Sequence, residues 1–356
     1  MRHTEGTAPA ARVVRLDALT SLRSFAALAV FGRHLLVRAE HPAWLDHVLG
    51  QGSTGVSLFF LLSGFLLTTA TSERNGPRPF YRRRFARIYP AYLVAGIVCT
   101  VAAVALAQTA WPPPQAVPAA LLLVQAWIPE REIYWGVLDV AWSLSAEIYL
   151  MFPLVIGRLR ALELRARRLL LAALVAGVFA LGALLGDRSD LGFWFVYIFP
   201  PTRFAEFVVG ILLALEVAAG TWPRLDWRAA VVFAAAGYLA ASWAPVGIGL
   251  VAVTLVPFVV LIGAVAQADA SGDLERSWLR RRPLIVLGIW SYGFYLVHAT
   301  VLEIGRGQGW SLVVMLIICL PVAIGAAGLL YSWVERPAEQ RLARRASPSR
   351  LAATPD

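Results

Sequence analysis

The chain has 356 residues, of which 59% are hydrophobic and only 15% are charged. Soluble domains carry about 25% charged residues, so this composition excludes an ordinary water-soluble globular protein and indicates lipid around most of the chain. The formal net charge is +10, and all 32 basic residues are arginine. These arginines lie between apolar segments, which favours a topology signal over a nucleic-acid-binding surface.

The apolar segments predict ten membrane-spanning helices, because most of them approach the roughly 20 residues that a crossing needs. Residues 1–15 are polar and are expected to form a disordered cytoplasmic tail. The spans are expected near residues 17–37, 54–71, 88–108, 137–157, 168–186, 202–219, 228–243, 246–267, 284–304 and 311–334, the second and seventh being short. Segment 116–127 is apolar but too short to cross, so an interfacial or re-entrant helix is expected there.

The distribution of arginine predicts the orientation in the membrane. With the N-terminus in the cytoplasm, 25 arginines fall on the cytoplasmic side and 4 in the outer loops. Cytoplasmic loops are enriched in Lys and Arg, so both termini are expected in the cytoplasm. The sequence thus predicts an all-α, multi-pass protein of the plasma membrane, with one transmembrane domain at 16–337, a cytoplasmic tail at 338–356 and no internal repeat.

The first span carries Arg23 and His34 within an apolar helix. A charge at the bilayer centre costs roughly 2.5–3.5 kcal/mol on insertion scales, so a simple anchor would not have these residues. They are eleven residues apart, which is close to three helical turns, so both are expected on one face about 16 Å apart. That face suits a long donor with an anionic end and a reactive end.

The second span contains Ser63 and Gly64 inside the bulky segment FFLLSGFLL. Small residues within a membrane helix favour close packing against another helix. The alternative is that Ser63 or the backbone lines a substrate passage.

At the start of the third span, RRRFARIYP places Arg84 and Arg87 three residues apart on one helix face. Part of this cluster serves as an ordinary topology signal. Guanidinium groups also bind phosphates bidentately, so a phosphate site at Arg84 and Arg87 is the second interpretation.

The fourth span contains Ser143 and Glu147 one turn apart in WSLSAE. A carboxylate inside a membrane helix is usually paired or functional. Counting along the two spans leaves Glu147 somewhat deeper than His34, and a contact between them is a hypothesis.

Polar residues also lie in the later spans. Arg203 and Glu206, three residues apart in the sixth, are expected to neutralise each other. In the ninth, polar side chains at i, i+4 and i+7 predict a stripe that lines a cavity: Ser291, Tyr295 and His298. Glu335, at the end of the tenth, is expected near the Arg84 cluster.

Six motifs follow one another along the chain: SLRSFAALAVFGRH, FFLLSGFLL, RRRFARIYP, WSLSAE, SYGFYLVHA and WVERP. Together they resemble the acyltransferase-3 family of integral membrane O-acyltransferases over nearly the whole chain. The resemblance implies transfer of an acyl group, commonly acetyl, from cytoplasmic acyl-CoA to a hydroxyl on a cell-surface glycan or, in actinobacterial members, a macrolide antibiotic. Thr20 stands where many members have Asp, and no appended hydrolase-like domain is expected.

The family's R-x10-H pattern falls on Arg23 and His34, its R-x-x-R on Arg84 and Arg87, and its WSLS-x-E ends at Glu147. The resemblance implies that the arginines bind acyl-CoA, with acetyl-CoA the expected donor and no metal. His34 is expected to act as general base, because imidazole titrates near neutral pH, with Glu147 orienting it or compensating its charge. A covalent acyl-His34 intermediate is the alternative. Four further residues are expected to bind substrate: Ser143, Ser291, Tyr295 and His298.

A rival hypothesis is a transporter for a glycan or lipid intermediate, in which the buried His, Glu and Arg would form a proton relay. Transporters commonly carry repeats and broken helices in matching positions, and the sequence has none that we recognise. A membrane scaffold would not need His34 and Glu147 inside its spans.

Overall fold

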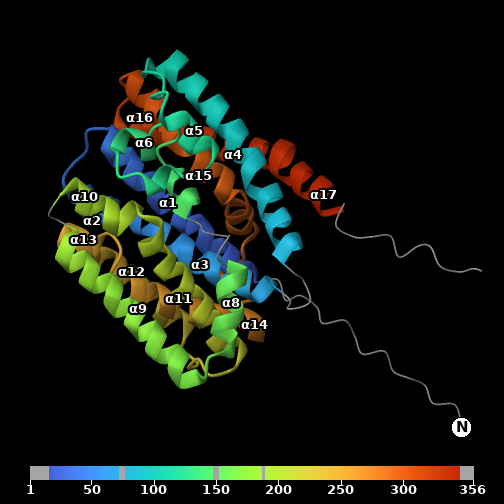
Figure 1. Cartoon of the computed structure of the whole chain (residues 1–356). Helices are drawn as coiled ribbons and strands as arrows, with labels where there is room; N and C mark the ends of the chain where they lie inside the picture. The colour runs from blue at the N-terminus through green and yellow to red at the C-terminus, as the bar shows by residue number, and fades with distance from the viewer. Residues whose placement is uncertain (1–15, 72–76, 147–151, 187–188, 345–356) are drawn as a thin grey trace, which may run out of the picture.

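The computed structural model describes residues 16–71, 77–146, 152–186 and 189–344, and all regular secondary structure in these ranges is helical (Figure 1). The α-helices are α1 (Asp17–Arg38), α2 (Trp44–Val48), α3 (Gly55–Ala70), α4 (Pro77–Ala107), α5 (Ala116–Leu121), α6 (Arg131–Tyr134), α7 (Trp142–Ala146), α8 (Phe152–Ala161), α9 (Leu164–Leu185), α10 (Asp190–Phe193), α11 (Pro200–Ala218), α12 (Trp227–Ala240), α13 (Val246–Gly249), α14 (Leu255–Ser271), α15 (Arg282–Gly307), α16 (Leu312–Leu330) and α17 (Arg336–Arg344). Short 3-10 or π-helical turns are η1 (Gly50–Thr54), η2 (Gln125–Trp127), η3 (Trp194–Ile198), η4 (Ala241–Trp243), η5 (Trp278–Arg280) and η6 (Tyr331–Glu335). The predicted all-helical class is therefore confirmed for these ranges.

Helices α1 and α15 lie side by side and run in the same direction. Arg23 meets Ser291 near one end of the pair, and His34 meets His298 further along. The helices approach closely because a Cβ atom at Gly288 would lie only 2.0 Å from the carbonyl oxygen of Thr20. Glycine at this position thus sets the register that brings the polar face of α1 against the polar stripe of α15.

Helices α3 and α11 also pack backbone against backbone. A Cβ atom at Gly64 would lie 2.1 Å from the carbonyl oxygen of Phe207, and one at Gly210 would lie 2.2 Å from that of Leu61. The prediction that Gly64 serves close helix packing is confirmed.

A buried ion pair within α11 also contacts α3. Arg203 and Glu206 are both about 1% exposed and lie 3.1 Å apart, and Arg203 also donates a hydrogen bond of 3.1 Å to Ser57 of α3. The guanidinium stacks against the rings of Phe60 and Tyr197, each 5.1 Å away. The predicted neutralisation is confirmed, and the contacts account for Arg203 as a structural residue.

Six helices in the described ranges are long and apolar enough to cross a membrane, by length and composition. They are Trp44–Ala70, Pro77–Ala107, Leu164–Leu185, Asp190–Ala218, Arg282–Gly307 and Leu312–Arg341. Helix α1 is not among them, because Arg23, Arg33 and His34 interrupt its apolar stretch, and α12 and α14 are shorter. The number ten and the cytoplasmic position of both termini stay predictions.

Two predicted spans are not continuous helices. Residues 137–141 form turns, and the helix begins only at Trp142, because Asp139 is drawn toward Arg38 of α1. Residues 250–254 form turns between α13 and α14. Here Gly247 packs so tightly that a Cβ atom would lie 2.4 Å from the Cα of Gly186, which holds α13 apart from the following helix.

The segment expected to be interfacial or re-entrant consists of two short helical pieces, α5 and η2, rather than one helix. The chain breaks at Leu123, which has a φ of 54°. Its depth in the membrane stays a prediction.

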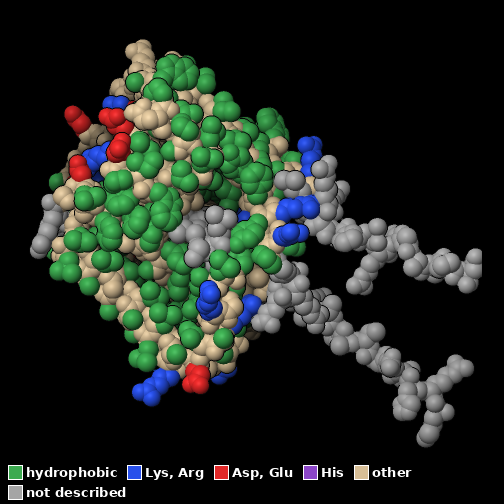
Figure 2. All heavy atoms as spheres, in the orientation of Figure 1, with side chains coloured by type: hydrophobic (Ala, Val, Ile, Leu, Met, Phe, Trp, Pro, Cys, Tyr) green, Lys and Arg blue, Asp and Glu red, His purple; other side chains and the backbone are tan. Residues whose placement is uncertain are grey.

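The surface agrees with a membrane setting. Figure 2 shows hydrophobic side chains covering the flanks of the helices on the face drawn, whereas charged side chains gather toward opposite ends. Many of the arginines in this view lie around α17, the start of α4 and the lower ends of α8 and α9, and a smaller group lies among acidic side chains in the part of the view where α6 and α16 are labelled.

Candidate functional site

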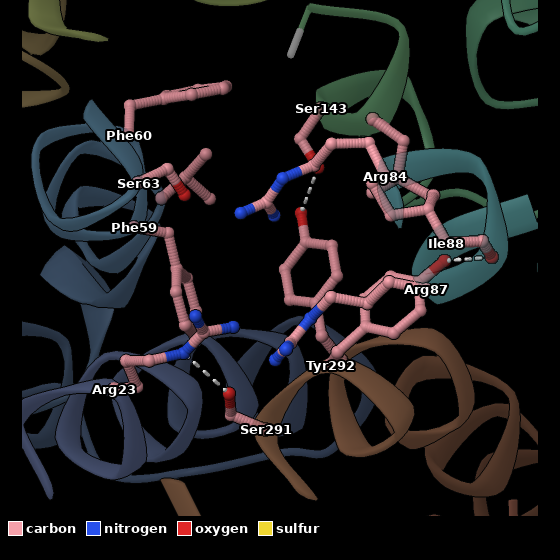
Figure 3. Close-up of a pocket in the computed structure, with 13 residues that line it drawn as sticks. Arg23, Phe59, Phe60, Ser63, Arg84, Arg87, Ile88, Ser143, Ser291 and Tyr292 are labelled. Atoms are coloured by element: carbon pink, nitrogen blue, oxygen red, sulfur yellow. Dashed lines mark hydrogen bonds between the residues drawn. The ribbon is translucent and has the colours of Figure 1, made fainter. Parts of the chain in front are cut away.

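A cavity lies between α1, α3, α4, α7 and α15 (Figure 3). It brings together six predicted site residues that come from four separate motifs. They are Arg23, Arg84, Arg87, Ser143, Ser291 and Tyr295. Ser63 also lines the cavity, and the alternative that it lines a substrate passage stays a prediction.

Three guanidinium groups point into this cavity, those of Arg23, Arg84 and Arg87 (Figure 3). Arg23 donates a hydrogen bond of 3.2 Å to Ser291 and lies 5.8 Å from the ring centre of Phe59. Arg84 and Arg87 project from the first turns of α4, one helical turn apart, as the sequence predicts. The arrangement concentrates positive charge in a confined space, which suits a ligand with several anionic groups.

Two carboxylates offset part of this charge. Glu339 of α17 forms an ion pair of 3.4 Å with Arg87, and both side chains are about one-third exposed, at 35% and 37%. Glu335 is buried and interacts electrostatically with Arg87 and Arg23, which confirms its predicted position near the arginine cluster. In this group the three arginines outnumber the two acids.

Ser143 and Tyr295 form the inner wall of the cavity. Their hydroxyl oxygens are 3.0 Å apart, and the Tyr295 hydroxyl donates a hydrogen bond of 3.1 Å to the carbonyl oxygen of Val140. This hydrogen bond orients Tyr295, so Ser143 donates to it. The two side chains tie α7 to α15 and present hydroxyl groups to whatever enters.

His34 and His298 form a pair beyond this wall. Nδ1 of His34 lies 3.1 Å from Nε2 of His298, and the ring centres are 5.0 Å apart. Neither ring lines the arginine cavity, which differs from the expectation that His298 lines it together with Ser291 and Tyr295. The reason is that His298 points toward α1, where it meets His34, although its ring still contacts Tyr295 at 5.8 Å.

Asp139 is a charged neighbour of this pair to which the sequence reasoning assigned no role. It forms an ion pair of 2.5 Å with Arg38, which also pairs with Glu303 at 3.1 Å. Asp139 interacts electrostatically with both His34 and His298. Two features of the sequence could have indicated this role. Asp139 lies at the start of the span that contains WSLSAE, and Arg38 lies one helical turn beyond His34.

A second, more open cavity lies on the other side of the histidine pair. Along α1, Arg23 lines the first cavity and Arg38 the second, with His34 between them. Along α15, the first cavity ends at Tyr295 and the second begins at Ala299, with His298 between them. The histidine pair therefore separates two spaces that share no lining residue.

The other predicted catalytic residue, Glu147, lies outside the described residues. In the ranges that are described, no group of three or more His, Cys, Asp or Glu side chains could hold a metal ion. The prediction that no metal takes part stays a prediction.

Comparisons with known proteins agree on one kind of chemistry. A family model described as "Acyltransferase domain" (Acyl_transf_3) matches residues 16–332. The chain is 37% identical to "Acyltransferase MdmB" of Streptomyces mycarofaciens, with 94% of each chain covered. No solved structure matches.

Two further relatives are longer proteins. The chain is 24% identical to "O-acetyltransferase OatA" of Staphylococcus aureus, covering 92% of this chain and 57% of that one. It is 28% identical to "Putative peptidoglycan O-acetyltransferase YrhL" of Bacillus subtilis, covering 90% of this chain and 54% of that one. The chain thus spans just over half the length of these two relatives.

Proposed function

We propose, since the chain belongs to the acyltransferase-3 family, that it transfers an acyl group from acyl-CoA to a hydroxyl of a glycan or of a natural product such as a macrolide. Family and relatives make it a membrane acyltransferase that acts on hydroxyl groups. We propose in addition that acyl-CoA is the donor, that acetyl is the group transferred, that the acceptor is a glycan or a natural product, and that the protein lies in the plasma membrane.

The observation that carries the proposal is the convergence of Arg23, Arg84 and Arg87 on one cavity. Coenzyme A carries a diphosphate and a 3′-phosphate, and Arg forks bind phosphate oxygens bidentately. Arg84 and Arg87 lie at the start of α4, within the segments that the arginine distribution assigns to the cytoplasm. We therefore assign them to the phosphates of cytoplasmic acyl-CoA and Arg23 to a deeper part of the donor.

The two cavities suggest separate approaches for the two substrates. The donor would extend from the arginine cavity past Ser143, Ser291 and Tyr295 toward His34. The acceptor would reach the same histidine from the second cavity, beside Arg38 and Asp139. This arrangement explains why the histidine pair lies between two spaces instead of in either one.

In the proposed step, His34 takes the proton from the acceptor hydroxyl as its oxygen bonds to the thioester carbonyl carbon. The tetrahedral oxyanion then collapses, the carbon–sulfur bond breaks, and the thiolate of coenzyme A takes the proton from His34. The products are an ester and free coenzyme A. The Asp139 carboxylate would stabilise the transient imidazolium, and Glu147 keeps its proposed role in orienting or compensating His34.

The acceptor is proposed from the relatives and the fold together. The name of YrhL mentions peptidoglycan, which is a glycan. The name of MdmB, of which 94% of the length is matched, says only that it is an acyltransferase. Because this chain covers only 54% of YrhL but 94% of MdmB, a natural product and a glycan both belong in the acceptor panel.

The test is to incubate membranes containing the protein with radiolabelled acetyl-CoA and a panel of glycan and macrolide acceptors. We expect label to appear in an ester product. Membranes containing His34→Gln should lose about 10²–10⁴-fold in rate, because Gln keeps a polar side chain but cannot take up a proton. Transfer by a correctly inserted His34→Gln protein at the wild-type rate would end the general-base assignment, and no labelled product with any acceptor would reject the proposed reaction.

A further inference from the structure

The two nitrogens of His298 have different partners. Nδ1 lies 3.1 Å from the carbonyl oxygen of Phe294 and 2.9 Å from that of Tyr295. Carbonyl oxygens only accept hydrogen bonds, so Nδ1 of His298 must carry a proton. In the neutral ring, Nε2 then holds a lone pair and acts as an acceptor.

That acceptor faces His34. Because Nε2 of His298 lies 3.1 Å from Nδ1 of His34, Nδ1 of His34 must be the donor when both rings are neutral. A neutral imidazole carries one ring proton, so Nε2 of His34 is left with the lone pair. Two backbone carbonyls on α15 therefore determine, through His298, which nitrogen of His34 is basic.

The two rings differ in their burial, as expected if His298 orients His34 and only His34 meets the substrate. His298 is fully buried at 0% exposed and is stacked on Phe294, with ring centres 5.5 Å apart and planes within 6°. His34 keeps part of its surface accessible. Thus His298 is held in one orientation and is closed to substrate, whereas His34 is only partly buried.

We propose that His298 is a positioning residue which holds the proton of neutral His34 on Nδ1 and so makes Nε2 the catalytic base. This inference rests on the proposed acyl transfer. The charged groups around His34 are Asp139, Arg38 and Arg33, and none of them donates or accepts a hydrogen bond at its ring in the described contacts. Among the described residues, His298 is thus the partner that selects the tautomer of His34.

The proton count is simple. The acceptor hydroxyl gives its proton to Nε2 of His34, whose ring becomes a cation that still donates from Nδ1 to His298. The same proton passes to the sulfur of coenzyme A as the carbon–sulfur bond breaks. His298 neither gains nor loses a proton, so it differs from a second acid–base group.

The position of the proton can be read directly by solid-state NMR of the full-length protein in lipid bilayers with ¹⁵N-labelled histidine. Subtracting the spectrum of His34→Gln isolates the signals of His34 at a pH where the ring is neutral. We expect a protonated Nδ1 in the wild type, and a shift of the proton to Nε2, the form that a free histidine side chain prefers, in His298→Leu. A wild-type His34 protonated on Nε2 would overturn the inference even if no variant folds.

Transfer kinetics separate positioning from packing. Leu fills the space of His298 without an acceptor, whereas the side-chain oxygen of Gln at the same position can accept the hydrogen bond from His34. We expect His298→Leu to lower kcat by about 10²–10⁴-fold with an unchanged KM for acyl-CoA, and His298→Gln to recover part of the rate. Equal rates for the two variants would show that the ring only packs.

Failure of the underlying function would look different. If wild-type membranes transfer no acyl group to any acceptor, the proposed reaction is rejected, yet the NMR signal still reports which nitrogen of His34 is protonated. If wild type is active but its Nδ1 carries no proton, the tautomer inference alone is wrong.

Discussion

At the scale of single residues, the arginine cavity shows how the chain tolerates cations inside a membrane domain. Arg23 is held by Ser291 and by the face of Phe59, and Arg87 by Glu339. Arg203, in contrast, is enclosed by Glu206 and two aromatic rings, with about 1% of its surface exposed. Arginines that line a cavity can bind a ligand, whereas the guanidinium of Arg203 is buried and already bonded to Glu206 and Ser57.

The double substitution Arg84→Ala and Arg87→Ala should raise the KM for acyl-CoA more than it lowers kcat. Each charged phosphate contact is worth roughly 1.5–3 kcal/mol in binding, while the chemistry at His34 is left intact. Steady-state kinetics over a range of acyl-CoA concentrations measure this. Arg82→Ala is the matched control, since Arg82 lies on the same helix and does not line the cavity. An unchanged KM in the double variant would remove Arg84 and Arg87 from the donor site.

At the scale of elements, the parallel pair of α1 and α15 positions the chemistry. The two helices touch at Gly288, whose missing side chain lets the backbone at Thr20 come into contact. This contact fixes the register, so Arg23 meets Ser291 and His34 meets His298. Small changes in the spacing of α1 and α15 should therefore affect the histidine pair as well as stability.

We expect Gly288→Ala to lower the thermal unfolding temperature and the transfer rate together. The added methyl group would lie 2.0 Å from a carbonyl oxygen, and overpacking of this kind costs about 1–3 kcal/mol. Gly325→Ala in α16 is the matched control, because its Cβ atom would meet nothing within 4 Å and alanine favours the helix by about 0.5–1 kcal/mol. Unfolding of both proteins in lipid nanodiscs measures the difference. Equal unfolding temperatures for Gly288→Ala and wild type would contradict the packing argument.

At the scale of the whole molecule, the orientation in the membrane decides which cavity faces the cytoplasm. Helices α1 and α15 are parallel, so their first residues lie on the same side. The predicted topology places this side, with 25 of the arginines, in the cytoplasm and only 4 in the outer loops. The arginine cavity would then open toward the compartment that contains acyl-CoA.

A reporter that is active only in the cytoplasm should be active when fused to the C-terminus. The same reporter fused after Gly309, in the loop between α15 and α16, should be inactive, because that loop is predicted to lie outside. Fluorescence or enzyme activity in intact cells measures both fusions. The opposite pattern would place the arginine cavity outside and exclude cytoplasmic acyl-CoA as its ligand.

The sequence by itself determined the helical class and the main members of the arginine cavity. Apolar segments of about 20 residues indicate membrane helices without any knowledge of tertiary contacts. Helical periodicity placed Arg23 and His34 on one face of α1 and Ser291, Tyr295 and His298 on one stripe of α15, and hydrogen bonds between these helices confirm both predictions. These features depend only on spacing within one helix.

Only the tertiary structure decided which faces meet and where helices break. The depth of a residue on one helix relative to another depends on a register that is set by a distant contact, here Gly288 against Thr20. His34 therefore meets His298, a pairing that spacing within either helix could not reveal. The turn at 137–141 has the same origin: Asp139 pairs with Arg38, about a hundred residues away, and this contact outweighs the local preference for a continuous helix.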